Sequence, residues 1–355
     1  MKTRDVYLIN GQTLKDSDTV TLDLTSNLKI LYLIVKYSAT NGGTSNTLAR
    51  IAGQVSKLAV IDGSNVLHSL SMDEEQAKNF YDYKALPYQF LTQAAGAIPI
   101  EEAIIDFRRY PGDQNFYLDC SQYQNPQLQF THSLTVSATA GFATGTGKLT
   151  VIARVIDSGA APKQGYVMAK ELDSFASAAS GDHTTNLPLD FPIASLIVLD
   201  PQVGQTPDYS LSNFKLSQDN DAFIPIDMTF LDLLARNYDE YGEAQQDVKL
   251  LAAAAPVDHS DLYGSVWPWI TQQAVTGGLV VSVAGNTITV TNTGATVATI
   301  RAAGTAPKSS VIYKFGDGID PASIFSPQGV GQFQLKLTNA NTGATPKIVT
   351  VQQHS

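Results

Sequence analysis

The chain has little charge and almost no cysteine. Asp, Glu, Lys and Arg make up 16% of its 355 residues, and Cys120 is its single cysteine. One cysteine excludes an internal disulfide framework, and no C-x-x-C or H-x-x-x-H spacing offers a metal site. No run of about 18 apolar residues occurs, so no segment is expected to span a membrane. The opening residues MKTRDVYLINGQ lack the apolar core of a signal peptide.

Basic residues are in the minority. The 23 Lys and Arg residues stand against 33 Asp and Glu residues, which gives a formal net charge of -10. Nonspecific nucleic-acid binding needs a surplus of cations that replace counterions along the phosphates. We therefore expect no direct nucleic-acid binding by this chain.

Motifs for catalysis are also missing. The stretch GFATGTGKLT, residues 141–150, contains the Gly-Lys of a phosphate-binding loop, but Phe142 stands where that loop needs glycine. Leu149 replaces its magnesium-binding hydroxyl, and no G-x-S-x-G elbow occurs. Asp106, Asp113 and Asp119 suggest no acid and base pair. We expect no enzyme and no cofactor.

Metal binding is not favoured either. His132 shares an alternating face with Phe130 and Leu134, so it is interpreted as an interior histidine rather than a ligand. The loops DHSD, residues 258–261, and DGID, residues 317–320, could hold a hard cation through carboxylates. Ordinary aspartate turns are the favoured interpretation, and no metal is expected.

Strand signals dominate what is present. Apolar and polar residues alternate around residues 20–25, 128–134, 149–155 and 333–337, while LKILYLIVKY, residues 28–37, is nearly continuous. Turn signals such as Asn-Gly-Gly and Asp-Gly separate these runs. With a length that suits two domains, the pattern predicts an all-β protein with two sandwiches or barrels.

Two stretches repeat each other. Residues 57–83 align without a gap with residues 215–241, 158 positions later. Identical residues include Lys57 and Lys215, Ala77 and Ala235, Asn79 and Asn237, and Tyr83 and Tyr241. Ser71-x-x-Glu74 and Thr229-x-x-Asp232 both predict a helix N-terminus, and apolar residues follow each at helical spacing. Each repeat therefore predicts two strands and one short helix.

The second repeat carries an insertion. Thirty residues separate Tyr83 from Asp113, whereas 76 separate Tyr241 from Asp317. The extra segment, about residues 245–308, is expected to be a β-rich tower that projects outward. Trp267 and Trp269 lie in it and are candidate tower or contact residues.

The repeat and the turn signals predict the domain boundaries. Residues 1–16 are interpreted as an N-terminal segment and residues 17–157 as the first domain. The small and polar residues 158–165 predict a linker, and residues 166–355 form the second domain.

The repeated halves resemble a known family. The stretch IDGSNVLHSL, residues 61–70, continued to Asn79-Phe80-Tyr81, resembles double jelly-roll major capsid proteins of tailless icosahedral phages with an internal membrane. Residues 107–110, 116–118 and 123–128 add to this likeness to the tectivirus-like branch of the adenovirus lineage. The second half is less similar, because Asp219-Asn220-Asp221 replaces an apolar run.

The resemblance implies a structural role. It implies two tandem antiparallel jelly rolls, each with a short flanking helix, in a homotrimer whose six jelly rolls make a pseudo-hexagonal capsomer. Neighbouring capsomers and minor capsid and vertex proteins would be its partners in the virion, after synthesis in the host cytoplasm. Lys2 and Arg4 would then face the internal membrane. Removal of about residues 245–306 is expected to leave a folded trimer, because the insertion lies outside the repeat.

Two other functions remain open from the residues alone. One is a carbohydrate-binding or adhesive surface protein, for which Tyr88, Phe90, Tyr110, Tyr117 and Tyr123 could form a sugar platform. Core or subunit packing is the commoner role of aromatics spaced along strands. The other is a glycan hydrolase with two jelly rolls, which would need a carboxylate pair between its domains.

Overall fold

The computed structural model describes residues 1–46, 49–201, 206–250, 262–263, 267–273, 279–284, 287–292, 298–317, 319–320 and 322–354. Within residues 248–302 the description covers the backbone and its strand pairing. Among the described residues, no helix combines the length and the apolar character needed to cross a membrane.

The first half of the chain is a jelly roll. Its two sheets run in the orders β1-β12-β3-β8 and β2-β10-β5-β6, and every pair within them is antiparallel. The first sheet comprises β1 (Lys2–Thr13), β12 (Lys148–Ser158), β3 (Lys29–Ser38) and β8 (Ile100–Asp106). The second comprises β2 (Ser17–Asp23), β10 (Pro126–Ser133), β5 (Val55–Asp62) and β6 (Asn65–Leu70).

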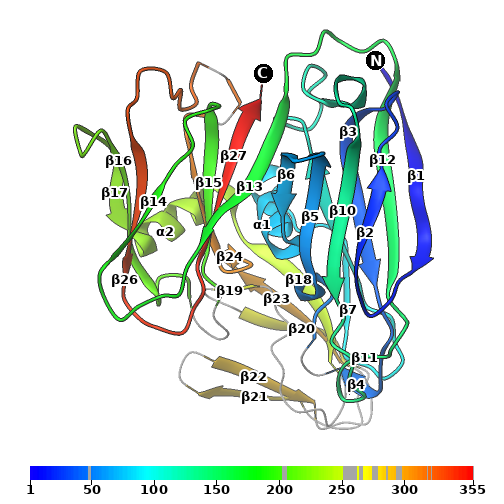
Figure 1. Ribbon diagram of the computed structural model, residues 1–355. Helices are drawn as coiled ribbons and strands as arrows, with labels where there is room; N and C mark the ends of the chain where they lie inside the picture. Colours follow the sequence, from blue (N-terminus) through cyan, green and yellow to red (C-terminus); the bar gives the residue numbers. More distant parts are fainter. Residues whose placement is uncertain are drawn as a thin grey trace.

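The second half repeats this topology strand by strand. One sheet runs in the order β13-β27-β15-β25 and the other in the order β14-β26-β16-β17. The first of these comprises β13 (Tyr166–Ser174), β27 (Lys347–His354), β15 (Ile193–Leu199) and β25 (Ser310–Lys314). The second comprises β14 (Asp182–Asn186), β26 (Phe333–Asn339), β16 (Leu211–Gln218) and β17 (Phe223–Thr229). The prediction of two tandem jelly rolls is confirmed (Figure 1).

Shorter elements connect these strands. In the first half they are β4 (Asn41–Asn46), η1 (Ala52–Gln54), β7 (Gln89–Thr92), β9 (Leu118–Asp119), η2 (Cys120–Gln122) and β11 (Ala140–Phe142). In the second half they are β18 (Ala244–Leu250), β19 (Leu262–Tyr263), β20 (Trp267–Gln273), β21 (Leu279–Ala284), β22 (Thr287–Asn292), β23 (Ala298–Gly304) and β24 (Ala306–Pro307).

Both repeats place a helix after the same strand. Helices α1 (Met72–Tyr83) and α2 (Phe230–Tyr241) follow β6 and β17 and begin 158 positions apart. Ser71 and Glu74 form the complete capping box that the sequence predicts. In the second repeat Thr229 accepts a hydrogen bond from the Asp232 amide at 3.1 Å, so its N-cap is confirmed too.

The asparagine shared by the two repeats has the same contacts in both. The Asn79 side chain donates to the Ile104 carbonyl at 2.7 Å and accepts from the Ile104 amide at 2.8 Å. Asn237 makes the same two bonds with Ile312, at 2.8 and 2.7 Å. Each asparagine thus satisfies the amide and the carbonyl of one strand residue, in β8 for Asn79 and in β25 for Asn237. These bonds attach the helix to the sheet and explain the identity at this position of the repeat.

The segment Asp219-Asn220-Asp221 is a turn rather than a strand interior. All three residues have positive φ values, 49°, 57° and 66°, and they join β16 to β17. Asp and Asn tolerate this left-handed backbone better than apolar residues. The Asp219 carboxylate also accepts hydrogen bonds from the amides of Gly331 and Gln332, both at 2.9 Å. This turn explains the departure from the apolar run of the first repeat.

The N-terminal residues are part of the first jelly roll. Residues 1–16 were interpreted as a separate segment, but β1 pairs with β12 from Lys2 to Thr13. It occupies the same place in its sheet as β13 in the second repeat. Weak alternation in a half-exposed edge strand hid this role in the sequence. Residues 159–165 connect β12 to β13.

The insertion does not leave the second jelly roll as a free tower. Strand β18 pairs in parallel with β7, at Val248 with Leu91 and at Lys249 with Thr92. Strands β23 and β20 continue from it, so the sheet of the first jelly roll has nine strands in all (Figure 1). Strands β21 and β22 pair only with each other among the described residues. Residues 245–306, the segment expected to be removable, therefore include strands that continue the sheet of the first jelly roll.

We predict that residues 274–297 can be replaced by a two-residue Asn-Gly turn. Gln273 and Ala298 face each other in the β20–β23 pair, so a tight turn can connect them. The free energy of unfolding should change by less than about 1 kcal/mol, because the loop lies outside both jelly rolls. Chemical denaturation followed by circular dichroism measures this change.

The wider deletion of residues 245–306 is the matched comparison. It removes β18 and β23 and uncovers residues around β7, and Ala303 and Ala306 are 1% and 0% exposed. This variant should be clearly less stable than the short deletion. Equal stability of the two variants would show that the β7–β18 pairing contributes nothing to the fold.

Candidate assembly surfaces

The two jelly rolls are joined by a shared sheet. Ser69 in β6 pairs in parallel with Lys170 in β13. The resulting eight-stranded sheet runs in the order β2-β10-β5-β6-β13-β27-β15-β25 through both repeats (Figure 1). Because backbone hydrogen bonds fix both distance and direction, this pairing holds the repeats in one relative orientation.

Helix α1 is enclosed at this junction. Nine of its residues are buried, and Ala77, Phe80 and Tyr81 belong to the hydrophobic core of the second jelly roll rather than the first. The Tyr81 hydroxyl donates to the Ser310 carbonyl at 2.8 Å, and its ring lies edge-on to Tyr241 with 5.0 Å between centroids. Helix α1 therefore lies as a wedge between the two repeats.

Two groups of ion pairs cross the junction. In the first, Asp73 of α1 lies 2.9 Å from Lys308 of the second repeat and 3.2 Å from Arg50 of its own repeat. Burial by itself would raise the pKa of Asp73, but Lys308 and Arg50 outweigh it and hold this pKa at about 2. Burial lowers the pKa of Lys308 to about 8 despite the attraction of Asp73. At neutral pH both groups are therefore charged and face each other across the junction.

In the second group, one lysine lies between two carboxylates. Lys347 of β27 lies 2.8 Å from Glu74 of α1 and 3.1 Å from Glu171 of β13. Burial, with a hydrogen bond to Glu171, raises the pKa of Glu74 to about 7, and Lys347 opposes this rise. The pKa of Glu171 is lowered, because its bonds to Glu74 and Lys347 outweigh its burial. The pKa values of the two carboxyl groups thus shift in opposite directions, and Lys347 binds both of them.

A further polar pair is buried where α1 faces its own jelly roll. His68 Nε2 lies 2.6 Å from the Glu75 carboxylate, and both side chains are 0% exposed. No sequence pattern pointed to a contact of His68, Asp73, Lys308 or Lys347, and Glu74 was predicted only to cap its own helix. A signal was present, because α2 has Leu231, Leu233 and Leu234 where α1 has Asp73, Glu75 and Gln76. The different residues reflect different surroundings of the same helix.

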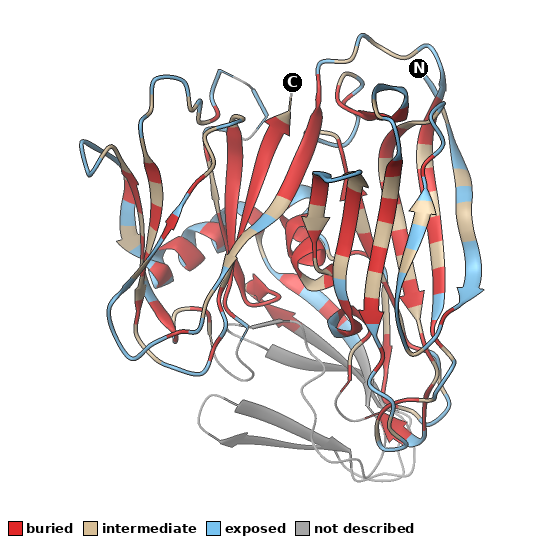
Figure 2. Cartoon of the chain, viewed as in Figure 1, coloured by how far each residue is buried: buried red, intermediate tan, exposed pale blue. Residues whose placement is uncertain are grey.

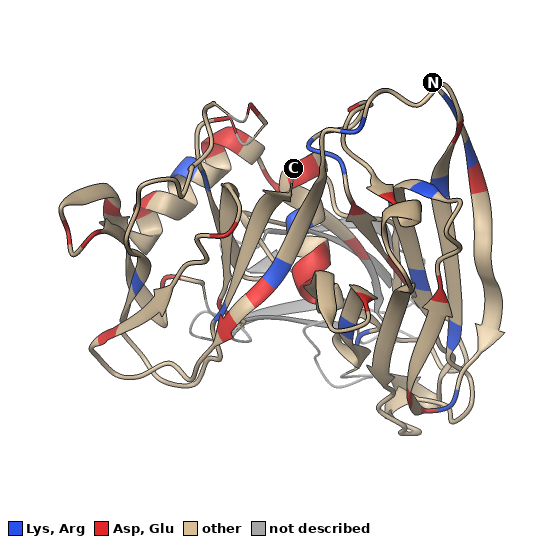
Figure 3. Cartoon of the chain, turned by 45° about the horizontal axis from the view of Figure 1, so that its top comes forward, with Lys and Arg blue, Asp and Glu red and all other residues tan. Residues whose placement is uncertain are grey.

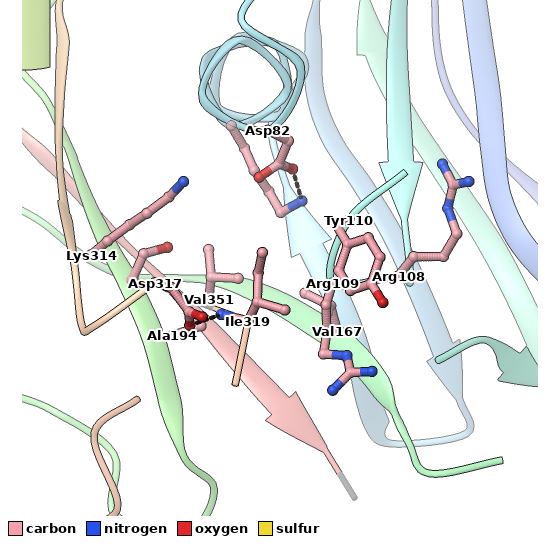
Figure 4. A pocket seen from close by; sticks show the side chains of 12 residues that line it. Asp82, Arg108, Arg109, Tyr110, Val167, Ala194, Lys314, Asp317, Ile319 and Val351 are labelled. Carbon is pink, nitrogen blue, oxygen red and sulfur yellow. Dashed lines mark hydrogen bonds and ion pairs between the residues drawn. The ribbon is translucent and has the colours of Figure 1, made fainter. Parts of the chain in front are cut away.

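A small cavity of about 100 Å³ lies between the repeats. It is lined by residues of α1 and the loop after β8 on one side and of β13, β15, β25 and β27 on the other (Figure 4). Three of its four basic side chains have carboxylate partners: Lys78 has Asp82 at 2.6 Å, Arg108 has Asp106 at 2.8 Å and Arg109 has Asp113 at 2.7 Å. The fourth, Lys314, lies over the Tyr241 ring, 4.9 Å from its centroid. The cavity is therefore a packing space of the junction rather than a site for an anion.

The corresponding surfaces on the outer sides of the chain are open. Strand β1 is equivalent to β13, and β17 is equivalent to β6. Strands β13 and β6 pair with each other, whereas β1 and β17 are sheet edges. Every residue of β15 is buried, whereas the equivalent strand β3 alternates between buried and half-buried residues (Figure 2). One face of the first sheet thus lacks the cover that the same face has in the second repeat.

The residues that the sequence analysis singled out lie apart from the junction. Lys2 is exposed on β1, and Arg4 lies 3.1 Å from Asp157 with 63% of its side chain exposed. Trp267 and Trp269 belong to β20, where they pair with Ala303 and Arg301. Their side chains lie outside the described part of the structure.

The histidine and the loops considered for metal binding have other contacts. His132 is buried and its Nε2 lies 2.9 Å from the Lys15 carbonyl, in agreement with an interior histidine. Asp317 accepts hydrogen bonds from the amides of Ile319 and Asp320 at 2.8 and 2.9 Å, so it forms an aspartate turn. Residues 258–261 lie outside the described residues. Within the described residues no group of three or more His, Cys, Asp or Glu side chains could hold a metal ion.

Known structures of double jelly-roll major capsid proteins are similar to this chain over its whole length. The MCP of STIV, Sulfolobus Turreted Icosahedral Virus, has a TM-score of 0.61 at 11% identity, covering 100% of this chain and 97% of that chain. The major capsid protein of bacteriophage PM2 has a TM-score of 0.55 at 11% identity, with 100% and 98% covered. The PBCV-1 virus capsid protein has a TM-score of 0.61 at 10% identity, with 99% and 93% covered.

The sequence itself matches no protein-family model and no curated protein. The similarity is therefore one of fold, and it confirms the fold that the resemblance implied.

We predict that Asp73→Asn lowers stability in a pH-dependent way. The pKa of Asp73 is about 2 in the folded chain against an ordinary value of 3.8, so its contribution is complete above about pH 5 and is lost as pH falls through about 2. At about pH 6 the free energy of unfolding of the variant should be lower by about 1–2 kcal/mol. This figure is reduced for solvent screening, because the Asp73 side chain is 32% exposed. Urea denaturation at several pH values measures the difference, which should close toward about pH 2.

Asp18→Asn is the matched control. Asp18 lies 3.8 Å from Lys15 on the surface, and both side chains are exposed. Its effect should be small at every pH. A loss of stability in Asp73→Asn that stays constant from neutral to acid pH would contradict the charge-based role of Asp73.

Proposed function

We propose that this chain is a major capsid protein that builds an icosahedral shell. The observation that carries the proposal is the rigid pairing of two equivalent jelly rolls through one continuous sheet. Such a chain presents two similar units side by side, so three copies can supply six units around an axis. The fold of viral capsid proteins, matched over the whole chain, supports the same role.

The alternative of a carbohydrate-binding surface protein has weaker support. Of the five aromatic residues considered for a sugar platform, Tyr117 is 2% exposed, while Tyr88 and Tyr110 are 58% and 40% exposed. Tyr88 lies before β7, whereas Tyr110 lies in the loop after β8. The aromatics therefore form no single platform on the described surface. No catalytic role is part of the proposal.

We predict a stable trimer in solution. Light scattering at micromolar concentration should give a mass of three times 38.1 kDa that persists on dilution, because subunits of a permanent shell bury large interfaces, above about 2,000 Å². Electron microscopy of the same particles should show pseudo-hexagonal outlines. A chain that stays at 38.1 kDa at the highest concentration reached would contradict the proposal.

The two ends of the molecule suggest its orientation in the shell. Both chain termini lie at one end, while β20, β21 and β22 lie toward the other (Figure 1). The proposal places the end with the termini toward an internal membrane, where Lys2 and Arg4 are exposed, and the insertion with Trp267 and Trp269 outward. Basic and acidic positions alternate beside the N-terminus (Figure 3), so any attraction to anionic lipid is modest.

Further partners follow from the role in a shell. Neighbouring capsomers would contact the sides of the trimer, and minor capsid and vertex proteins would fill the gaps and the fivefold positions. The virion would be the site of action, after synthesis in the host cytoplasm.

We predict that Lys2→Gln with Arg4→Gln weakens binding to anionic vesicles. Each exposed cation near an acidic surface contributes on the order of 1 kcal/mol, so the partition coefficient should fall by about 5- to 30-fold, with Asp157 reducing the share of Arg4. Co-sedimentation with phosphatidylglycerol vesicles measures it.

Lys15→Gln with Lys148→Gln is the control with the same change of charge. Both lysines are exposed near the opposite end of β1, where Thr13 pairs with Lys148. This variant should bind vesicles as the unchanged protein does. An equal loss in both variants would show that net charge, rather than the N-terminal end, governs binding.

A further inference from the structure

The junction between the two repeats covers surfaces of the first repeat whose equivalents in the second repeat are exposed. In the first repeat, β6 is paired by β13, and the outward residues of α1 are covered by the second jelly roll. In the second repeat, β17 and α2 occupy the same places. Among the described residues, however, β17 is a sheet edge and the outward residues of α2 are exposed. At the other end of the chain, β1 and the outer face of its sheet are open as well.

The exposed face of α2 is apolar at the positions that α1 buries. Phe80 is 1% exposed, whereas Tyr238, 158 positions later, is 44% exposed. Ala77 is fully buried, whereas Ala235 is exposed. Leu231, which corresponds to Asp73, is 58% exposed. Leu231, Ala235 and Tyr238 are spaced to form one stripe along the helix.

The adjoining edge strand adds two exposed apolar residues. Phe223 and Ile224 of β17 are 59% and 41% exposed. Because β17 is also a sheet edge, its backbone groups are available for another strand. The stripe of α2 and the edge of β17 together form the α2 surface.

A second apolar row lies on the first sheet. The register aligns Tyr7, Ile152, Ile34 and Ile104 as cross-strand neighbours on β1, β12, β3 and β8. Tyr7 is 61% exposed, and the three isoleucines are half-buried. This row and the β1 edge form the β1 surface. On the second sheet the outward-facing Ser195 and Val351 line the junction and are buried.

We propose that the α2 surface of one copy docks on the β1 surface of a second copy, with the arrangement that α1 and β6 have against β13 and its sheet. The inference rests on the proposed function and specifies its subunit contact. The contact is head-to-tail, because it joins two different surfaces, and its repetition around a threefold axis closes a ring of three copies.

The new contact differs from the junction in its chemistry. Leu231 stands where Asp73 binds Lys308, and Asp232 corresponds to Glu74. The β1 surface presents isoleucine and tyrosine side chains at its centre. The contact between copies is thus more apolar at the position of Leu231, and it lacks the ion pair that Asp73 forms within the chain.

The test places charge on each surface separately. Leu231→Glu with Tyr238→Glu alters the α2 surface, and Ile34→Glu with Ile152→Glu alters the β1 surface. Each variant should lose the trimer and sediment at 38.1 kDa, with the dissociation constant raised by at least about 100-fold. Val136→Glu, at a residue 51% exposed on neither surface, should remain trimeric.

Mixing the two variants tests the direction of the contact. The unchanged α2 surface of one variant can still bind the unchanged β1 surface of the other, so a species of twice 38.1 kDa should form. Absence of any heavier species at the highest concentration reached would contradict a head-to-tail contact. Circular dichroism and thermal melting establish that each variant folds, and Leu231→Gln with Tyr238→Gln serves as a milder pair if the charged one does not.

Failure of this inference differs from failure of the proposed function. If the unchanged protein is a trimer and both surface variants stay trimeric, the subunit contact lies elsewhere. If the unchanged protein is monomeric, the trimer itself is wrong. In the expected result, the unchanged protein and Val136→Glu are trimers while both surface variants are monomers.

Discussion

The pairing of β6 with β13 is the contact on which the rest of the structure depends. It turns two jelly rolls into one body and encloses α1 between them. An enclosed helix must satisfy every polar group that it carries, because an unpaired buried charge is costly. This requirement accounts for the partners of Asp73, Glu74 and Glu75, which come from both repeats.

The two repeats show how one backbone takes different side chains in different surroundings. Asn79 and Asn237 make the same pair of backbone bonds, since both helices attach to a strand in the same way. The residues around them differ, because α1 lies inside the chain and α2 lies on its outer side. Charged pairs lie at the junction within one chain, whereas exposed apolar residues suit the proposed contact of the α2 surface with a second copy.

Much of the fold could be predicted from the sequence. The repeat of residues 57–83 predicted the strand pair and the capped helix of both halves, since caps and periodicity are local properties. The place of residues 1–16 could not be predicted, because β1 is an edge strand with weak alternation. The insertion was recognised, but its pairing with β7 depends on residues more than 150 positions away and left no local signal.

The sequence by itself determined two strand-rich halves, their capped helices and the absence of common catalytic and metal motifs, because these depend on local pattern and residue type. The jelly-roll topology was implied by the resemblance to a known family. The tertiary structure decided which surfaces are covered and which are open. Burial of α1, the charge pairs across the junction and the open edges of β1 and β17 arise from contacts between distant segments. Strand pairing over such distances follows from the whole fold, which no short stretch of sequence encodes.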